Sequence, residues 1–200
     1  MLSAMSVIEI IDRIEALNRY LAQFWRKAGG WAPIESAGLL SKSRLDWQVS
    51  LSSSLRLWIR TPPDRLEDGE LILAWTNLGS LTEGTMKLFL SVFYHDYQKD
   101  IDGLKAAKAY HHKKQAPISP DGLSLDVMRA YFKNKEFFEA EIDTYVELVQ
   151  QRRNAIHAYQ DRPIGDDEEF QSAVLSYLLM LRAVNSRLPY PDGIYVPQEI

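Results

Sequence analysis

Residues 151–159 combine the side chains of a site that binds an anion and moves a proton. Arg152 and Arg153 are followed by Asn154, His157 and Tyr159. Arginine holds phosphate through paired hydrogen bonds and keeps its charge, and an imidazole can accept or donate a proton near neutral pH. The same residues also suit the C-terminal end of a helix, where cations interact favourably with the helix dipole. Both interpretations stay open on residue types alone.

A second basic segment precedes the middle of the chain. Lys105, Lys108, Lys113 and Lys114 lie in a ten-residue window that contains no acidic residue. Such a window can bind the phosphate backbone of a nucleic acid, although a solvated loop often has the same composition.

Other motifs that would indicate chemistry are absent from the sequence. There is no phosphate loop, GxSxG, HExxH or dinucleotide-binding glycine pattern. The chain has no cysteine, which excludes disulfides, thiolate zinc sites and cysteine nucleophiles. We therefore predict neither a metal site nor a cofactor.

The elements that must position these residues are helices. Apolar residues recur at spacings of three and four through most of the chain, which is typical of amphipathic helices. The predicted helices cover residues 6–27, 35–60, about 67–98, 124–132, about 136–159 and about 166–188. Residues 99–123 are predicted to form a long loop, with a short helix near 104–109 as one possibility. Residues 189–200 are predicted to form an extended tail, which is the one place where a strand is conceivable. The pattern predicts an all-α antiparallel bundle in a single helical domain, residues 1–188.

The longest predicted helix carries residues that could support the arginines. Gly79 and Gly84 lie inside it and predict close helix packing on that side, since glycine otherwise destabilises a helix. Glu83 and Lys87 are spaced to form an ordinary surface pair. Asn77 and Glu83 are alternatively candidates to face Arg152 and Arg153.

Composition and charge limit the classes of function. The 200 residues are 46% hydrophobic and 25% charged, with a formal net charge of −4, so the chain can form a core without disulfides. The mild acidity argues against a coat protein for nucleic acid and requires any polyanion to find a local basic site. Glu9 and Asp12 interrupt the apolar N-terminal stretch, and no apolar run approaches the roughly 18 residues of a membrane span. We therefore expect a cytoplasmic protein that does not bind a membrane.

The order of the residues adds a resemblance. Arg152, four residues, His157, one residue and Tyr159 resemble the RX4HxY signature of HEPN-domain proteins, which are helical bundles. The position near the end of a long helix, with one helix following, is also similar. Arg153 stands where the family has a polar residue, more usually asparagine. The HEPN-like core would cover about residues 70–188, and the first 60 residues would add further helices.

The resemblance implies a metal-independent ribonuclease whose biological role would be that of a toxin or a defence effector. The 2′-hydroxyl of RNA would attack the neighbouring phosphate and leave a 2′,3′-cyclic phosphate, with His157 moving the proton and Arg152 stabilising the transition state. Two motif copies face each other in HEPN ribonucleases, so a homodimer is expected. Tyr159 would line the cleft and could be nucleotidylated by an antitoxin or regulatory protein. Packing of Tyr159 at the bundle end is the alternative.

Helix geometry bears on which arginine acts. Residues five apart on an ideal helix differ by about 140° in direction, whereas residues four apart differ by about 40°. Arg153 would therefore share a face with His157, and Arg152 would not. The spacing of the family signature favours Arg152, provided that the helix ends or distorts before His157, which Asn154 would tolerate. Arg153 is the second choice, and Asn154 could orient either arginine.

Two further hypotheses remain open. The net negative charge and the short match, nine residues, fit a non-catalytic HEPN-like module that binds RNA, a nucleotide or a partner protein. Alternatively, residues 151–159 are only the end of a helix in a helical interaction protein.

Overall fold

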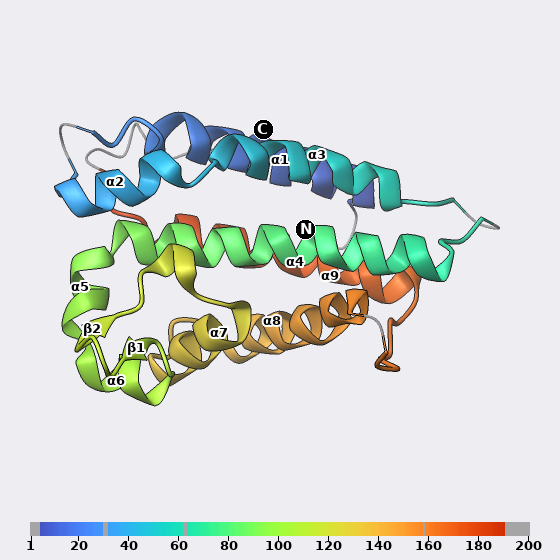
Figure 1. Cartoon of the computed structure of the whole chain (residues 1–200). Coiled ribbons are helices and arrows are strands. Elements are labelled where there is room, and N and C mark those ends of the chain that lie inside the picture. Colours follow the sequence, from blue (N-terminus) through green and yellow to red (C-terminus); the bar gives the residue numbers. More distant parts are fainter. Residues whose placement is uncertain (1–4, 30–31, 62–63, 158, 191–200) are drawn as a thin grey trace.

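The computed structural model describes residues 5–29, 32–61, 64–157 and 159–190 of the chain (Figure 1). This part is mostly helical, which confirms the predicted all-α class. The α-helices are α1 (Val7–Trp25), α2 (Ile34–Lys42), α3 (Leu45–Ser54), α4 (Asp68–Val92), α5 (Tyr94–Lys99), α6 (Ile101–Ala106), α7 (Leu125–Asn134), α8 (Ala140–Arg153) and α9 (Asp167–Asn185). The 3-10 helices are η2 (Leu55–Trp58), η3 (Pro120–Gly122) and η4 (Asn154–Ile156), and two short strands are β1 (Tyr110–His111) and β2 (Ala116–Pro117).

Helix α4 runs through the middle of the protein. Figure 1 shows α1 and α3 along one side of it and α7 and α8 along the other, with α9 behind it. Helix α9 packs against α1, α4 and α8, so it joins the two sides. One hydrophobic cluster of buried side chains extends from α1 to α9.

Helix α1 begins and packs as its sequence predicts. The side chain of Ser6 accepts a hydrogen bond from the Glu9 backbone, and the Glu9 carboxylate accepts one from the Ser6 backbone, which satisfies exposed N–H groups at the helix start. On the inner face, Asn18 Nδ2 donates to Ser52 Oγ at 2.8 Å and to Tyr177 OH at 3.2 Å. These buried polar contacts connect α1 to α3 and α9.

The two glycines of α4 lie where side chains of neighbouring elements pack closely against the helix. A Cβ atom at Gly79 would lie 2.7 Å from Arg153 Cδ, and one at Gly84 would lie 2.6 Å from atoms of the Gln48 side-chain amide. The predicted close packing is therefore confirmed on both sides of the helix.

Several predicted boundaries differ from the structure. The helix predicted over 35–60 divides into α2, α3 and η2. Arg44 adopts a left-handed conformation with φ of 49° and separates α2 from α3, whereas η2 follows α3 directly. The helix predicted over 67–98 ends at Val92, where Phe93 leaves helical geometry, with ψ of 31°, and separates α4 from α5. In both cases an apolar pattern continues across a local break in the backbone.

The predicted loop over 99–123 contains regular structure. It holds α6, an antiparallel hairpin in which Tyr110 pairs with Pro117 and His111 with Ala116, and η3. The prediction of no strand outside the tail is therefore wrong, because strands of two residues are too short to produce an alternating pattern. The predicted tail falls mainly on residues 191–200, outside the described residues. No helix in the described ranges is long and apolar enough to cross a membrane.

Candidate functional site

The C-terminal end of α8 places the residues of the predicted motif. The α-helix ends at Arg153 and continues as the 3-10 turn η4, after which His157 is extended, with φ of −83° and ψ of 112°. Asn154 is the C-cap of α8. The helix thus distorts between Arg152 and His157, which is the condition that the spacing of the signature requires.

Arg152 is held between α8 and the start of α9. Its Nε and Nη2 atoms donate to the two carboxylate oxygens of Glu169 at 2.7 and 2.9 Å, and its Nη1 donates to the Pro163 carbonyl at 2.9 Å. The hydrogen bonds to Glu169 raise the pKa of Arg152 above its ordinary value. With its side chain only 13% exposed, Arg152 links two helices in addition to any chemical role.

A glycine turn makes the contact with Glu169 possible. Gly165 has a φ of +73°, and a Cβ atom there would lie 1.9 Å from Glu169 Oε2. Glu169 is a functional partner of Arg152 that the sequence does not indicate, because the two residues are 17 positions apart. The acidic first turn of α9 was the one available signal.

Arg153 has a partner on α4. Its Nη1 donates to Glu83 Oε2 at 2.6 Å, while Lys87 Nζ lies 2.8 Å from Glu83 Oε1. Burial raises the pKa of Glu83, but hydrogen bonds from Lys87 and Arg153 outweigh it, so that this pKa lies below its ordinary value. Glu83 thus makes both of the contacts that the sequence offered as alternatives, the pair with Lys87 and the contact with an arginine. The expectation that Asn77 faces the arginines is wrong, because its side-chain amide lies 2.8 Å from Ser54 Oγ, towards α3.

His157 and Tyr159 extend from the turn after η4 into solvent. His157 is exposed, and within the described part of the chain its imidazole has no hydrogen bond or ion pair. Tyr159 is fully exposed, at 105% of its reference area, with a left-handed φ of 68°. It therefore does not pack at the bundle end. Both side chains are accessible to a ligand or a second protein.

The chain segment around this turn is not basic. Residues 151–170 contain three arginines and five acidic residues, which gives a formal charge of −2. Arg152 and Arg153 are each paired with a glutamate of the same chain. A polyanion would thus need additional cations to bind here strongly.

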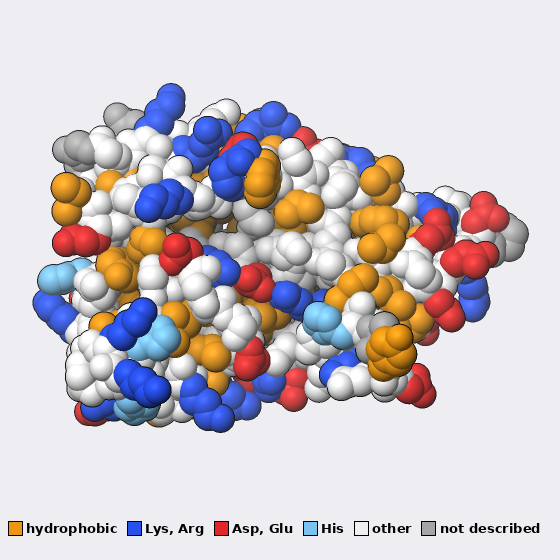
Figure 2. Space-filling view, viewed as in Figure 1, with side chains coloured by type: hydrophobic (Ala, Val, Ile, Leu, Met, Phe, Trp, Pro, Cys, Tyr) orange, Lys and Arg blue, Asp and Glu red, His pale blue; other side chains and the backbone are white. Residues whose placement is uncertain are grey.

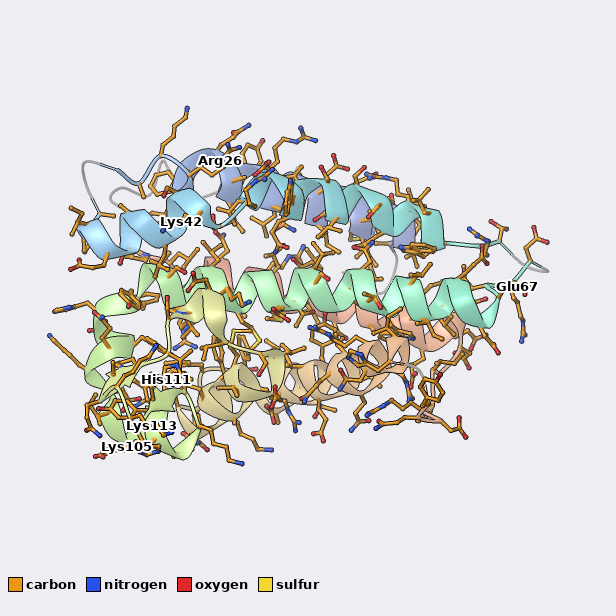
Figure 3. The ribbon with its side chains drawn as sticks, viewed as in Figure 1. Arg26, Lys42, Glu67, Lys105, His111 and Lys113 are labelled. Atoms are coloured by element: carbon orange, nitrogen blue, oxygen red, sulfur yellow. The ribbon has the colours of Figure 1, made fainter. Side chains whose placement is uncertain are left out.

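The predicted lysine segment lies at the other end of the protein. Figure 3 labels Lys105 and Lys113 beside His111, at the end formed by α6 and the hairpin, and Figure 2 shows Lys and Arg side chains gathered over this end. Lys105, Lys108, Lys113 and Lys114 are all exposed. The N-terminal end of α8 lies towards this side, and its 14 residues extend about 21 Å before Arg153. The lysines therefore do not flank Arg152 within one protomer.

Comparisons with protein-family models, curated proteins and solved structures give no match for this chain. Within the described residues, no group of three or more histidine, aspartate or glutamate side chains could hold a metal ion. The candidate site is accordingly defined by the α8–η4 turn and its residues.

Proposed function

We propose that this protein is a metal-independent ribonuclease of the HEPN type that acts as a homodimer, with Arg152 and His157 as its catalytic residues. The observation that carries the proposal is the break of α8 into η4, which leaves His157 exposed five residues after Arg152. RNA is the proposed substrate and the cytoplasm the proposed compartment.

The proposed chemistry uses the N–H groups of Arg152 that are not engaged in contacts within the chain. An arginine has five N–H groups, and the three contacts of Arg152 with Glu169 and Pro163 engage one each at Nε, Nη1 and Nη2. The two others can donate to a phosphate oxygen. His157 takes the proton of the 2′-hydroxyl, the 2′-oxygen bonds to phosphorus, and the bond to the 5′-oxygen breaks. The products are a 2′,3′-cyclic phosphate and a 5′-hydroxyl, which needs a proton from a general acid.

A second copy of the chain would supply the second imidazole that one chain lacks. One protomer offers one His157, whereas the reaction uses a base and an acid, and the partner's copy of the motif would provide the second imidazole. Pairing two turns would also bring four motif arginines to one cleft. The full exposure of Tyr159 fits a position at that cleft and an acceptor hydroxyl for a nucleotidylating antitoxin or other regulatory protein.

A second candidate function is a non-catalytic HEPN-like module that binds RNA, a nucleotide or a partner protein. The observation that favours it is the pairing of Arg152 with Glu169 and of Arg153 with Glu83, which neutralises both guanidinium groups within the chain. In this case the exposed turn is a contact surface.

Purified protein incubated with RNA in EDTA separates the two functions. We expect cleavage to cyclic-phosphate products, lost by at least about a hundredfold in His157→Ala and Arg152→Gln, and unchanged in the matched control His95→Ala, which removes another exposed imidazole. Equal cleavage by wild type and His157→Ala would reject the ribonuclease. RNA binding without cleavage, by a monomer in light scattering, would support the non-catalytic module.

A further inference from the structure

An aromatic cavity lies away from the α8–η4 turn. It has a volume of about 300 Å³, at the lower end of the roughly 300–1,000 Å³ typical of ligand sites. The C-terminal end of α4, α5, α7, the segment after α7 and the segment after α9 surround it. Figure 1 shows α5 at the end of the protein opposite the end of α8. The cavity is thus separate from the proposed catalytic turn.

Five aromatic rings form its walls: Phe89, Phe93, Tyr97, Tyr131 and Phe137. Ring centroids lie 4.8 Å apart for Phe89 and Phe93, 5.3 Å for Phe89 and Phe137, and 5.4 Å for Tyr97 and Tyr131.

The two phenol hydroxyls are already bonded. Tyr97 OH donates to the Ile118 carbonyl at 2.5 Å, and Tyr131 OH donates to Asp100 Oδ2 at 3.0 Å. The rings are held in place by these bonds, and the walls offer mainly apolar surface to a ligand.

Four charged side chains also line the cavity, and two of them neutralise each other. Lys135 Nζ lies 3.1 Å from Asp100 Oδ2. The other two are Asp96 and Arg187, both exposed, and neither has an ion-pair partner among the described residues. The apolar cavity therefore has one carboxylate and one guanidinium without counter-ions at its edge.

Arg187 is nevertheless held in position. It donates to the Phe137 carbonyl, and its guanidinium carbon lies 5.4 Å from the Phe89 ring centroid and 5.3 Å from that of Phe137. Because Asp96 and Arg187 form no ion pair with each other, their charged groups are more than 4.0 Å apart. Each of the two side chains can therefore pair with a separate charged group of a ligand.

We propose that this cavity binds a free α-amino acid with a large aromatic side chain. The ring occupies the apolar cavity, the ammonium group pairs with Asp96, and the carboxylate pairs with Arg187. An organic cation would leave Arg187 without a counter-ion, an organic anion would leave Asp96 without one, and an uncharged ring would leave both. A zwitterion with an apolar side chain matches all three features of the site.

Isothermal titration calorimetry of the full chain with three probes tests the proposal. L-Phenylalanine carries both charges, 2-phenylethylamine lacks the carboxylate, and 3-phenylpropanoate lacks the ammonium group. We expect L-phenylalanine to bind at least about tenfold more tightly than either analogue, because each analogue loses one charge-assisted contact.

Two substitutions assign the contacts. Asp96→Asn should weaken L-phenylalanine about tenfold and cause no loss of affinity for 3-phenylpropanoate, whereas Arg187→Gln should weaken L-phenylalanine similarly and cause no loss of affinity for 2-phenylethylamine. Retained binding of the analogue in each case shows that the cavity is intact. Asp102→Asn and Arg65→Gln, two exposed residues that do not line the cavity, are the matched controls.

Three results would overturn the proposal. They are no binding of L-phenylalanine at millimolar concentration, equal affinity for L-phenylalanine and either analogue, and equal effects of a cavity variant and its control. None depends on ribonuclease activity, so the ligand site and the proposed catalytic turn are tested separately.

Discussion

Replacing Glu169 with glutamine removes the charge that holds Arg152 between α8 and α9. Hydrogen bonds to charged groups stabilise proteins by about 1.5–3 kcal/mol. The Glu169 side chain is 33% exposed, so solvent screening reduces this figure. We therefore expect Glu169→Gln to lower the free energy of unfolding by about 1–2 kcal/mol, which corresponds to a Tm decrease of about 2–8 °C in a chain of this length.

A double-mutant cycle isolates the pair from other effects of the substitutions. Urea unfolding followed by circular dichroism would compare wild type, Arg152→Gln, Glu169→Gln and the double variant, with an expected coupling energy of about 1 kcal/mol. The matched control is the exposed pair Arg44–Asp46, whose side chains are 49% and 36% exposed and should show no measurable coupling. A coupling for Arg152 and Glu169 as small as that of the control would refute this account of the contact.

The same variants separate structural from catalytic roles of Arg152. If Arg152 stabilises the transition state, Glu169→Gln should retain RNA cleavage, because the guanidinium remains, while Arg152→Gln should lose it. Equal loss in both variants, in proportion to their stability, would indicate a purely structural arginine.

Three further substitutions test other contacts. Although burial raises the pKa of Glu83, hydrogen bonds from Lys87 and Arg153 lower it more. The Glu83 carboxylate therefore stabilises the fold above about pH 4.5, and this stabilisation is lost as the pH falls through the lowered pKa. The stability difference between wild type and Glu83→Gln in urea should thus shrink below pH 4.5, and a constant difference would contradict this. Trp75→Phe removes the 2.7 Å bond from Nε1 to the Ile164 carbonyl and should cost about 1–3 kcal/mol in thermal melts. Asn18→Ala removes two buried hydrogen bonds and should cost about 2–3 kcal/mol; a smaller loss would show that water replaces the amide.

The sequence predicted features that depend on neighbours along one helix. The apolar stripe of α1 is buried at Ile10, Ile14, Leu17 and Leu21, as its spacing requires. The Glu83–Lys87 pair formed for the same reason, since residues four apart share a face. Breaks such as the one at Phe93 were missed because an apolar pattern continues through them.

Features that depend on residues distant in sequence were mostly not predictable. Spacing gave Arg152, Arg153 and His157 as candidates, but the pairing of Arg152 with Glu169 depends on the path of the turn between α8 and α9. The location of the lysine segment at the opposite end likewise follows from the direction of α8. Likewise, nothing in the local pattern brings Asp96 and Arg187 to one cavity.

The packing of α1 against α9 has a consequence for synthesis of the chain. The Asn18 amide of α1 bonds to Tyr177 of α9, a residue 159 positions later. Until the ribosome has made α9, this amide lacks its bond to Tyr177, and the part of the apolar face of α1 that packs against α9 stays uncovered. Chaperones that bind exposed apolar segments would thus meet the N-terminal helices first, and release from them would follow the arrival of α9.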